Sequence, residues 1–274
     1  MASPGNTASP DGDTPVNATL SPGNGYNVIT VGGYDDRGTP SRSDDLIGGG
    51  GWINPPTTNG DNEKPEIVLP SVAIMTTLLN PTGAFGGGWF DERYGTSYAV
   101  PAATGVAALL MHRSAYLTYY PTALKAIMLV SSYGDIDGGG LVGPRDGTGG
   151  LDADRADKVA AGTQGGWNGG DYFCSSPAVV NLVTFDGVAG KWYRVAISWM
   201  ANPNHAQAAQ RPSSDLDMVV YGPSGGTVAM GAAKDRTWEF VRFQAPTTGG
   251  YTIQSQRVRC DSDPKQLSWA VYVE

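Results

Sequence analysis

The sequence changes pattern once along its 274 residues, and this change constrains the fold more than any other feature. Before about residue 168, some segments carry apolar residues at helical spacing and others are short β-branched runs. After that point only short strand-like runs separated by turn residues remain. These runs are 179–183, 192–199, 216–221, 238–243, 251–254 and 269–273. We therefore expect an α/β domain over residues 1–168, followed over 169–274 by an all-β antiparallel sandwich or jelly roll.

The first domain is expected to place two strands before its helices. Short apolar runs at 28–31 and 67–69 are each bounded by glycine or proline, which is typical of buried strands. Helical patterns begin at Ser97 and at Pro121, and a shorter one covers 151–161.

Charge and composition exclude several classes of protein. Lysine and arginine number 18 against 26 acidic residues, for a net charge of -8, and no basic cluster stands out, so we expect no nucleic-acid partner. The apolar runs fall far short of the roughly 20 residues that span a bilayer, so we expect no membrane helix. The first residues lack the basic and apolar regions of a secretory signal, so an export signal would be expected upstream of this chain.

Residues 95–110 form the most distinctive segment, GTSYAVPAATGVAALL, with a serine at the start of a helix rich in small residues. At a helix N-terminus, unpaired N–H groups and the positive end of the dipole favour a developing oxyanion. Serine is also a preferred N-cap, which is the alternative for Ser97 taken alone. The whole segment closely resembles the nucleophile segment of the subtilisin-like serine peptidases (subtilases), and this resemblance implies that Ser97 is the nucleophile.

Two earlier segments resemble the same family in the same order. Residues 26–33, YNVITVGG, are similar to its strand-and-glycine segment, and residues 64–70, KPEIVLP, to the one before the serine. Asn6, after Gly5, occupies the place of a family asparagine whose amide completes the oxyanion hole; the alternative is an ordinary turn residue. The resemblance covers about residues 3–160 and implies part of a subtilisin-like catalytic domain, with parallel strands and helices.

The family segments that hold the catalytic aspartate and histidine precede those matched here, and neither is recognisable in this sequence. Only two histidines occur. His112 would stand about 22 Å from Ser97 along one helix, at 1.5 Å per residue, and His205 lies in a polar loop of the second domain. We expect the chain to be inactive alone, with the missing N-terminal part of the catalytic domain as a partner.

Residues 213–225, SSDLDMVVYGPSG, resemble the β-domain appended to several secreted bacterial subtilases, where such domains stabilise the protease and sometimes bind calcium. Asp215 and Asp217, two residues apart on one strand face, are then the expected oxygen ligands; the alternative is a solvated or turn-capping pair. The two cysteines, Cys174 and Cys260, both lie in this domain and are expected to form a disulfide, with two buried free thiols as the alternative.

Three functions are consistent with these features. The first is a secreted serine endopeptidase that hydrolyses peptides or proteins through Ser97, with its aspartate and histidine supplied from outside this chain. The second is a truncated, non-catalytic pseudoenzyme whose β-domain binds or stabilises a partner. The third is an unrelated hydrolase, an esterase or a glycosidase, the latter using two carboxylates among Asp91, Glu92, Asp135 and Asp137.

Overall fold

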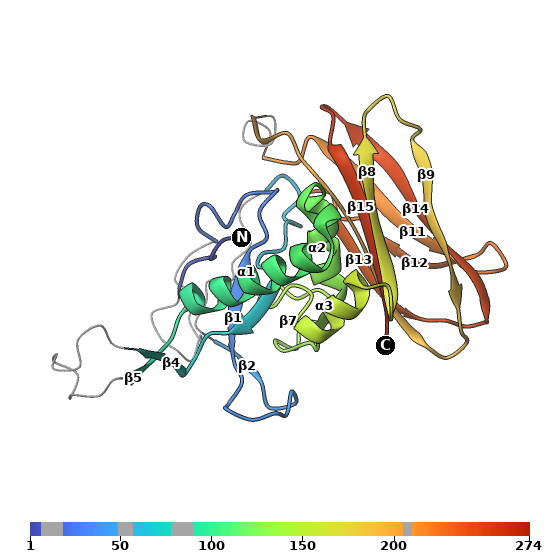
Figure 1. Cartoon of the computed structure of the whole chain (residues 1–274). Coiled ribbons are helices and arrows are strands. Elements are labelled where there is room, and N and C mark those ends of the chain that lie inside the picture. Colours follow the sequence, from blue (N-terminus) through green and yellow to red (C-terminus); the bar gives the residue numbers. More distant parts are fainter. Residues whose placement is uncertain (7–18, 49–56, 78–89, 205–209) are drawn as a thin grey trace.

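The computed structural model describes residues 1–6, 19–48, 57–77, 90–204 and 210–274. The described residues form a mixed α/β part followed by a sandwich of antiparallel strands. Two of the helices, Pro121–Val130 and Ala153–Ala160, lie where the α/β part meets the sandwich (Figure 1). No helix in the described ranges is long and apolar enough to cross a membrane.

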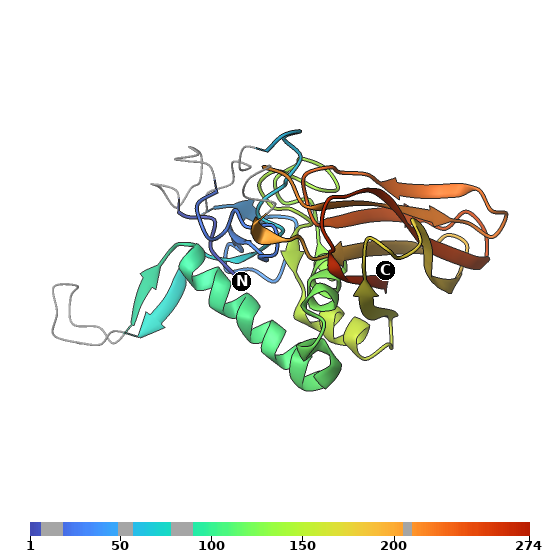
Figure 2. The same cartoon turned by 90° about the horizontal axis from the view of Figure 1, so that it is seen from above.

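The α/β part is built on a five-stranded sheet in the order β2-β1-β3-β7-β6. Its strands are β1 (Val31–Asp35), β2 (Leu46–Ile47), β3 (Ile67–Pro70), β6 (Ser132–Tyr133) and β7 (Gly150–Leu151). The central strands β1, β3 and β7 run parallel, and the two edge strands run antiparallel to their neighbours. A separate hairpin of β4 (Ile74–Thr77) and β5 (Phe90–Arg93) projects away from this sheet (Figure 2).

The first strand begins later than the sequence predicted. A strand was expected over 28–31 with a stop at Gly32, but β1 spans Val31–Asp35 and contains both glycines. These glycines are packing positions, because an added Cβ would lie 2.6 Å from the Pro65 ring at Gly32 and 2.0 Å from the Ser71 hydroxyl at Gly33. The prediction failed because it took them for turn residues.

The helices follow the predicted pattern closely. They are α1 (Thr96–Arg113), the short 3-10 helix η1 (Ala115–Thr118), α2 (Pro121–Val130) and α3 (Ala153–Ala160). Helix α1 packs on β1 and β3 through Ala99, Ala103, Ala107 and Leu110, which recur every three or four residues on one face. The Asp152 carboxylate caps α3 by accepting hydrogen bonds from its first N–H groups.

The second part consists of two facing four-stranded antiparallel sheets, in the orders β13-β10-β15-β8 and β12-β11-β14-β9. Its strands are β8 (Gly165–Tyr172), β9 (Val179–Gly187), β10 (Trp192–Trp199), β11 (Ser214–Tyr221), β12 (Thr227–Gly231), β13 (Trp238–Gln244), β14 (Gly249–Cys260) and β15 (Lys265–Val273). The six predicted strands are present, whereas β8 and β12 were not predicted. The division predicted near residue 168 falls within β8, which pairs with β15 along its length.

Helix α2 joins the two parts. Every residue from Thr122 to Val130 is buried, because α2 packs on β10 and β15 of the sandwich as well as on α3 and η1 of its own part. The Thr122 and Ser268 hydroxyls share a 2.7 Å hydrogen bond across this contact. The β13-β10-β15-β8 sheet is therefore covered on both faces, by α2 on one and by the second sheet on the other.

Candidate active site

Ser97 lies in the first turn of α1 with its side chain exposed. The preceding Gly95 has φ 130° and ψ 151°, a conformation that only glycine adopts readily, so it sets the direction in which the chain enters the helix. The Gly95 N–H donates to the Ser71 carbonyl (2.8 Å), just after β3. Pro101 lies one turn beyond Ser97 and has no N–H, so the Ser97 carbonyl lacks the usual helical donor.

The Asn6 side chain is held against the same helix terminus. Its Oδ1 accepts a hydrogen bond from the Thr96 N–H and another from the Thr96 hydroxyl, both 2.9 Å long. A Cβ placed on Gly95 would lie 3.1 Å from Asn6 Nδ2, so the amide nitrogen lies beside Gly95. These bonds use the acceptor atom of the carboxamide, whereas an oxyanion would use the donor atom.

The first residues of the chain reach this position by following β1. The Ala2 N–H donates to the Ile29 carbonyl (3.0 Å), and the Ala2 carbonyl accepts from the Val31 N–H (2.9 Å). Ala2 thus forms a parallel bridge beside Thr30, and the chain then continues to Asn6 at the helix terminus. The parallel edge of the sheet brings together Asn6 and Ser97, which are far apart in sequence.

No described histidine lies near Ser97. His112 is exposed in the last turn of the same helix, about 22 Å away at the helical rise per residue. His205 lies outside the described residues. The described part of the chain therefore offers Ser97 no imidazole base.

A buried cluster of charges, which the sequence did not predict, supports the strands behind the site. The Glu66 carboxylate accepts from Lys64 Nζ (2.5 Å) and Lys125 Nζ (2.8 Å), and also from the Thr30 N–H (2.7 Å). Burial lowers the Lys64 pKa to about 8, although Glu66 opposes this shift. Burial alone would raise the Glu66 pKa, but its two lysine partners outweigh it and hold that pKa below its ordinary value. The only sequence signal was a Lys and a Glu within an apolar strand segment.

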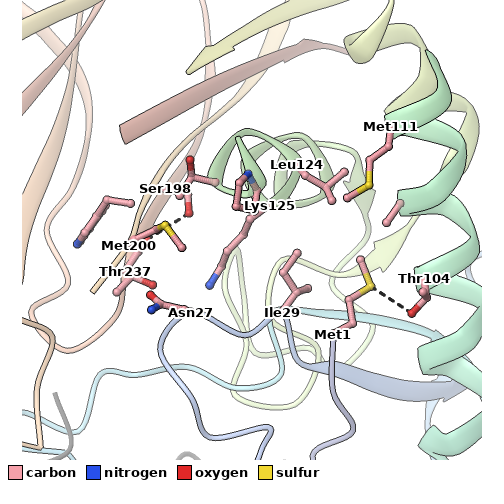
Figure 3. A pocket seen from close by; sticks show the side chains of 14 residues that line it. Met1, Asn27, Ile29, Thr104, Met111, Leu124, Lys125, Ser198, Met200 and Thr237 are labelled. Carbon is pink, nitrogen blue, oxygen red and sulfur yellow. Dashed lines mark hydrogen bonds between the residues drawn. The ribbon is translucent and has the colours of Figure 1, made fainter. Parts of the chain in front are cut away.

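Lys125 also borders a pocket of about 280 Å³ between α1, α2 and β10 (Figure 3). Its lining is largely apolar and includes Met1, Ile29 and Met111, with Asn27 and Thr237 as polar members. This pocket lies at the junction of the α/β part and the sandwich, and neither Ser97 nor Asn6 lines it.

The expected calcium ligands Asp215 and Asp217 lie on β11. Asp215 is buried with Arg259 Nη1 3.5 Å from its carboxylate, and Asp217 is half-buried. Burial raises the pKa of both groups, that of Asp215 to about 6. Among the described residues, no third Asp, Glu, His or Cys joins this pair at metal-ligand spacing.

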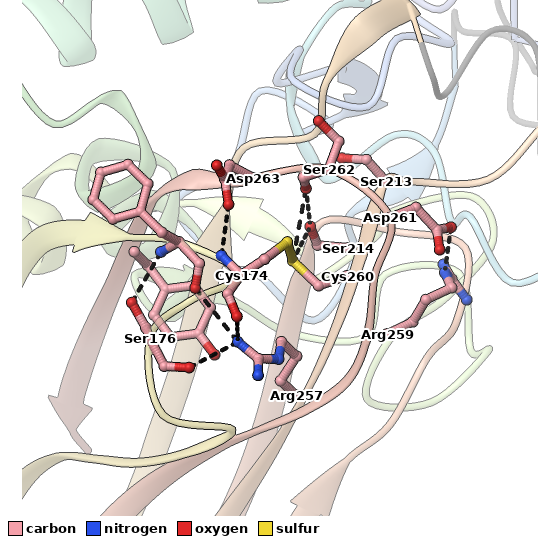
Figure 4. The surroundings of a disulfide bond; sticks show 12 residues. Cys174, Ser176, Ser213, Ser214, Arg257, Arg259, Cys260, Asp261, Ser262 and Asp263 are labelled. Atoms are coloured by element: carbon pink, nitrogen blue, oxygen red, sulfur yellow. Dashed lines mark hydrogen bonds and ion pairs between the residues drawn. A yellow bond between two sulfur atoms is a disulfide. The ribbon is translucent and has the colours of Figure 1, made fainter.

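Cys174 and Cys260 form a disulfide with Cα atoms 5.7 Å apart (Figure 4). It ties the turn after β8 to the end of β14, and so joins the two sheets of the sandwich. Nearby, Arg257 Nη1 donates to the Cys174 carbonyl (2.6 Å), and the Cys174 N–H donates to the Asp263 carboxylate (2.6 Å).

The carboxylates considered for a glycosidase occupy two different places. Asp91 and Glu92 belong to β5 in the projecting hairpin (Figure 2). Asp135 and Asp137 lie in the loop between β6 and β7, close to the buried carboxylate of Asp146. The sequence did not single out Asp146, because it lies in a glycine-rich stretch that reads as a solvated loop.

Comparisons with known proteins match this chain to one peptidase family. The family model described as "Subtilase family" matches residues 1–166. Serine protease AprX of Bacillus subtilis (strain 168) is 34% identical over 116 residues, which are 39% of this chain and 25% of AprX. The chain therefore spans about a quarter of the length of this curated relative.

Solved structures with a likeness to the chain include two maturation proteases. The Prenylagaramide maturation protease PagA is 25% identical, with 53% of this chain and 46% of PagA covered and a TM-score of 0.37. The Patellamide maturation protease PatA is 27% identical, with 50% and 44% covered and a TM-score of 0.34. Because the family model covers more than half of the 274 residues, this chain belongs to the subtilase family.

Proposed function

We propose that this chain is the nucleophile-bearing part of a secreted subtilisin-like serine endopeptidase. In this proposal Ser97 attacks the peptide carbonyl and forms an acyl-enzyme, and the Asn6 amide donates to the oxyanion. The aspartate and histidine come from a segment outside these 274 residues. The observation that carries the proposal is the exposed Ser97 at the start of α1, with the Asn6 carboxamide bound to the adjacent Thr96.

The second part of the chain is proposed to be a stabilising jelly-roll domain. In each sheet, strands from the first half of this segment (β8–β11) alternate with strands from the second half (β12–β15). This is the order expected when a jelly roll folds over as one long hairpin. Secretion is supported by the disulfide between Cys174 and Cys260, a bond that persists in oxidising compartments.

The proposal is tested by labelling with a fluorophosphonate and by peptide hydrolysis, with and without the N-terminal segment from the source protein. Without a base, Ser97 keeps the high pKa of an alcohol, and loss of triad members costs on the order of 10⁴ to 10⁶ in turnover. We therefore expect negligible labelling of the chain alone and strong labelling after the segment is supplied. Ser97→Ala must abolish the restored activity, whereas Ser224→Ala, at an exposed turn, must leave it unchanged.

Asn6→Asp separates the catalytic role of Asn6 from its structural one. The variant keeps an oxygen that can accept from the Thr96 N–H, but it loses the amide donor. We expect the kcat of the enzyme restored by the N-terminal segment to fall by a factor of about 10² to 10³, with little loss of stability. An unchanged kcat would remove Asn6 from the site, and hydrolysis that survives Ser97→Ala would refute the proposal as a whole.

A further inference from the structure

Three aspartates converge in the loop that links β6 to β7. Asp135, Asp137 and Asp146 each place a carboxylate oxygen within 4.8 Å of the others. Oxygens that share one Ca²⁺ at 2.3–2.6 Å can lie up to about 5 Å apart, so this spacing suits a single ion.

One of these carboxylates is buried and half-satisfied. Asp146 is only 1% exposed, and its Oδ2 accepts from the Ile136 N–H at 2.8 Å. Its Oδ1 is also buried, yet it has no hydrogen-bond partner among the described residues. An unsatisfied buried carboxylate oxygen is costly, and a bound cation would remove that cost.

The loop backbone leaves this oxygen directed at Asp137. A Cβ placed on Gly143 would lie 2.4 Å from Asp146 Oδ1 and 2.5–2.6 Å from both Asp137 oxygens, so the three atoms face one space beside this glycine. The Asp137 carboxylate is itself positioned by the N–H groups of Gly139 (2.6 Å) and Arg145 (3.1 Å). The Gly140 N–H holds Asp135 in the same way, at 3.1 Å.

Electrostatics support the same conclusion. The three carboxylates lie within 4.8 Å of one another, and Asp146 is buried, so little solvent separates their like charges. Carboxylates that repel one another in this way are stabilised by a shared cation.

We propose that Asp135, Asp137 and Asp146 form a calcium site that fastens the β6–β7 loop to the sheet. The side-chain donors are all carboxylate oxygens, which suits Ca²⁺, whereas the nitrogen and sulfur ligands that zinc prefers are missing from this trio. Ca²⁺ takes about six to eight oxygen ligands, so backbone carbonyl oxygens and water would complete the coordination.

The ion acts on the sheet through the residues that follow Asp146. The Thr148 N–H donates to the Glu66 carbonyl (2.9 Å), and the Gly149 carbonyl accepts from the Val68 N–H (3.1 Å). Calcium at Asp146 would thus fix the loop next to β3, the strand whose end leads to Gly95 and the Ser97 helix. The expected role is structural.

The test is isothermal titration of the chelator-treated chain with CaCl₂, together with melting curves in calcium and in chelator. We expect one Ca²⁺ per chain and a melting temperature that rises with calcium. Asp137→Asn and Asp146→Asn should each weaken binding at least about tenfold, because loss of even an outer-shell partner of a metal site costs about 10- to 100-fold in affinity. Because Asp146 is buried, its variant is checked by circular dichroism; the half-buried Asp137 carries the test if Asp146→Asn does not fold.

Asp217→Asn is the matched control, since it removes the same charge at the other acidic pair considered. It should bind calcium like the unaltered chain. Gly143→Ala fills the space beside the carboxylates without changing charge, and it should weaken binding as well. Absence of binding at about 10 mM calcium, above the 10⁻⁴–10⁻³ M range of extracellular calcium modules, would overturn the proposal. Binding that is lost in Asp217→Asn but kept in Asp137→Asn would also overturn it, by placing the ion in the sandwich.

Discussion

Replacement of Glu66 by glutamine tests how much the α/β part depends on its buried charges. Glu66 is fully buried and is the shared anion for Lys64 and Lys125, whose Nζ atoms lie 2.5 Å and 2.8 Å from Oε1. Glutamine keeps the shape of the side chain but leaves two buried ammonium groups without a counterion. Removal of one partner of a buried ion pair costs about 3–5 kcal/mol, and we expect Glu66→Gln to lose that much stability at pH 7.

The loss is measured by urea unfolding followed through tryptophan fluorescence. With a slope of about 3 kcal/mol per molar urea, the midpoint should fall by about 1–1.7 M. Glu92→Gln, the same substitution at an exposed position of β5, should change stability by less than about 0.5 kcal/mol. Equal midpoints for Glu66→Gln and Glu92→Gln would refute the reasoning.

The pH dependence of this loss gives a second check. The Lys64 pKa of about 8 lies below that of an unfolded lysine, so the folded chain binds fewer protons and this group makes stability rise with pH above 8. A neutral amine needs no counterion. The deficit of Glu66→Gln should therefore shrink as the pH rises from about 7 to 10; a deficit that grows over this range would contradict the assignment of the charges.

Two further predictions concern the sandwich. Thiol titration of the unreduced, denatured chain should find no free cysteine, and two reactive thiols would refute the disulfide. Replacing Cys174 and Cys260 by serine should lower the free energy of unfolding by up to about 4–5 kcal/mol, because the bond closes a loop with a sequence separation of 86. Burial raises the Glu239 pKa to about 7, against the opposing effect of Arg236. The folded chain therefore holds this proton more tightly than the unfolded chain does. The resulting stabilisation is complete below the pKa of the unfolded chain and is lost as the pH rises through 7. Stability measured across about pH 5–8 should therefore fall less steeply in Glu239→Gln than in the unaltered chain, and parallel curves would argue against a raised pKa.

Elements with strong local patterns could be predicted from the sequence. Helices α1 and α2 carry apolar or small residues at helical spacing, and the predicted strands of the sandwich are rich in β-branched and aromatic residues. Strand β8, GGWNGGDY, was missed because four of its eight residues are glycine. At Gly169 a Cβ would meet the Ser268 hydroxyl at 2.5 Å and the Tyr120 ring at 3.0 Å, so the glycine makes room for the neighbouring elements. The neighbouring elements, and not the preferences of its own residues, make this segment a strand, so its sequence alone does not predict one.

The residues of the candidate sites also differ in whether local sequence or tertiary contacts determine them. Ser97 is the predicted nucleophile because sixteen consecutive residues, 95–110, resemble one family pattern. The position of Asn6 depends on the Ala2–Thr30 bridge, a contact between segments that the sequence does not relate. Asp146 could not be found at all, because burial of a carboxylate in a glycine-rich loop depends on how that loop folds back on itself.

The position of α2 against a sheet of the sandwich has a consequence for how the chain acquires its structure. One side of this helix is covered by β10 and β15, and β15 comprises residues 265–273, long after α2 at 121–130. During synthesis the apolar surface of α2 therefore stays uncovered until β15, a central strand of that sheet, has emerged from the ribosome. A nascent chain that ends before β15 would expose this surface together with the unpaired edges of β8 and β10, and so would be a substrate for chaperones or a seed for aggregation.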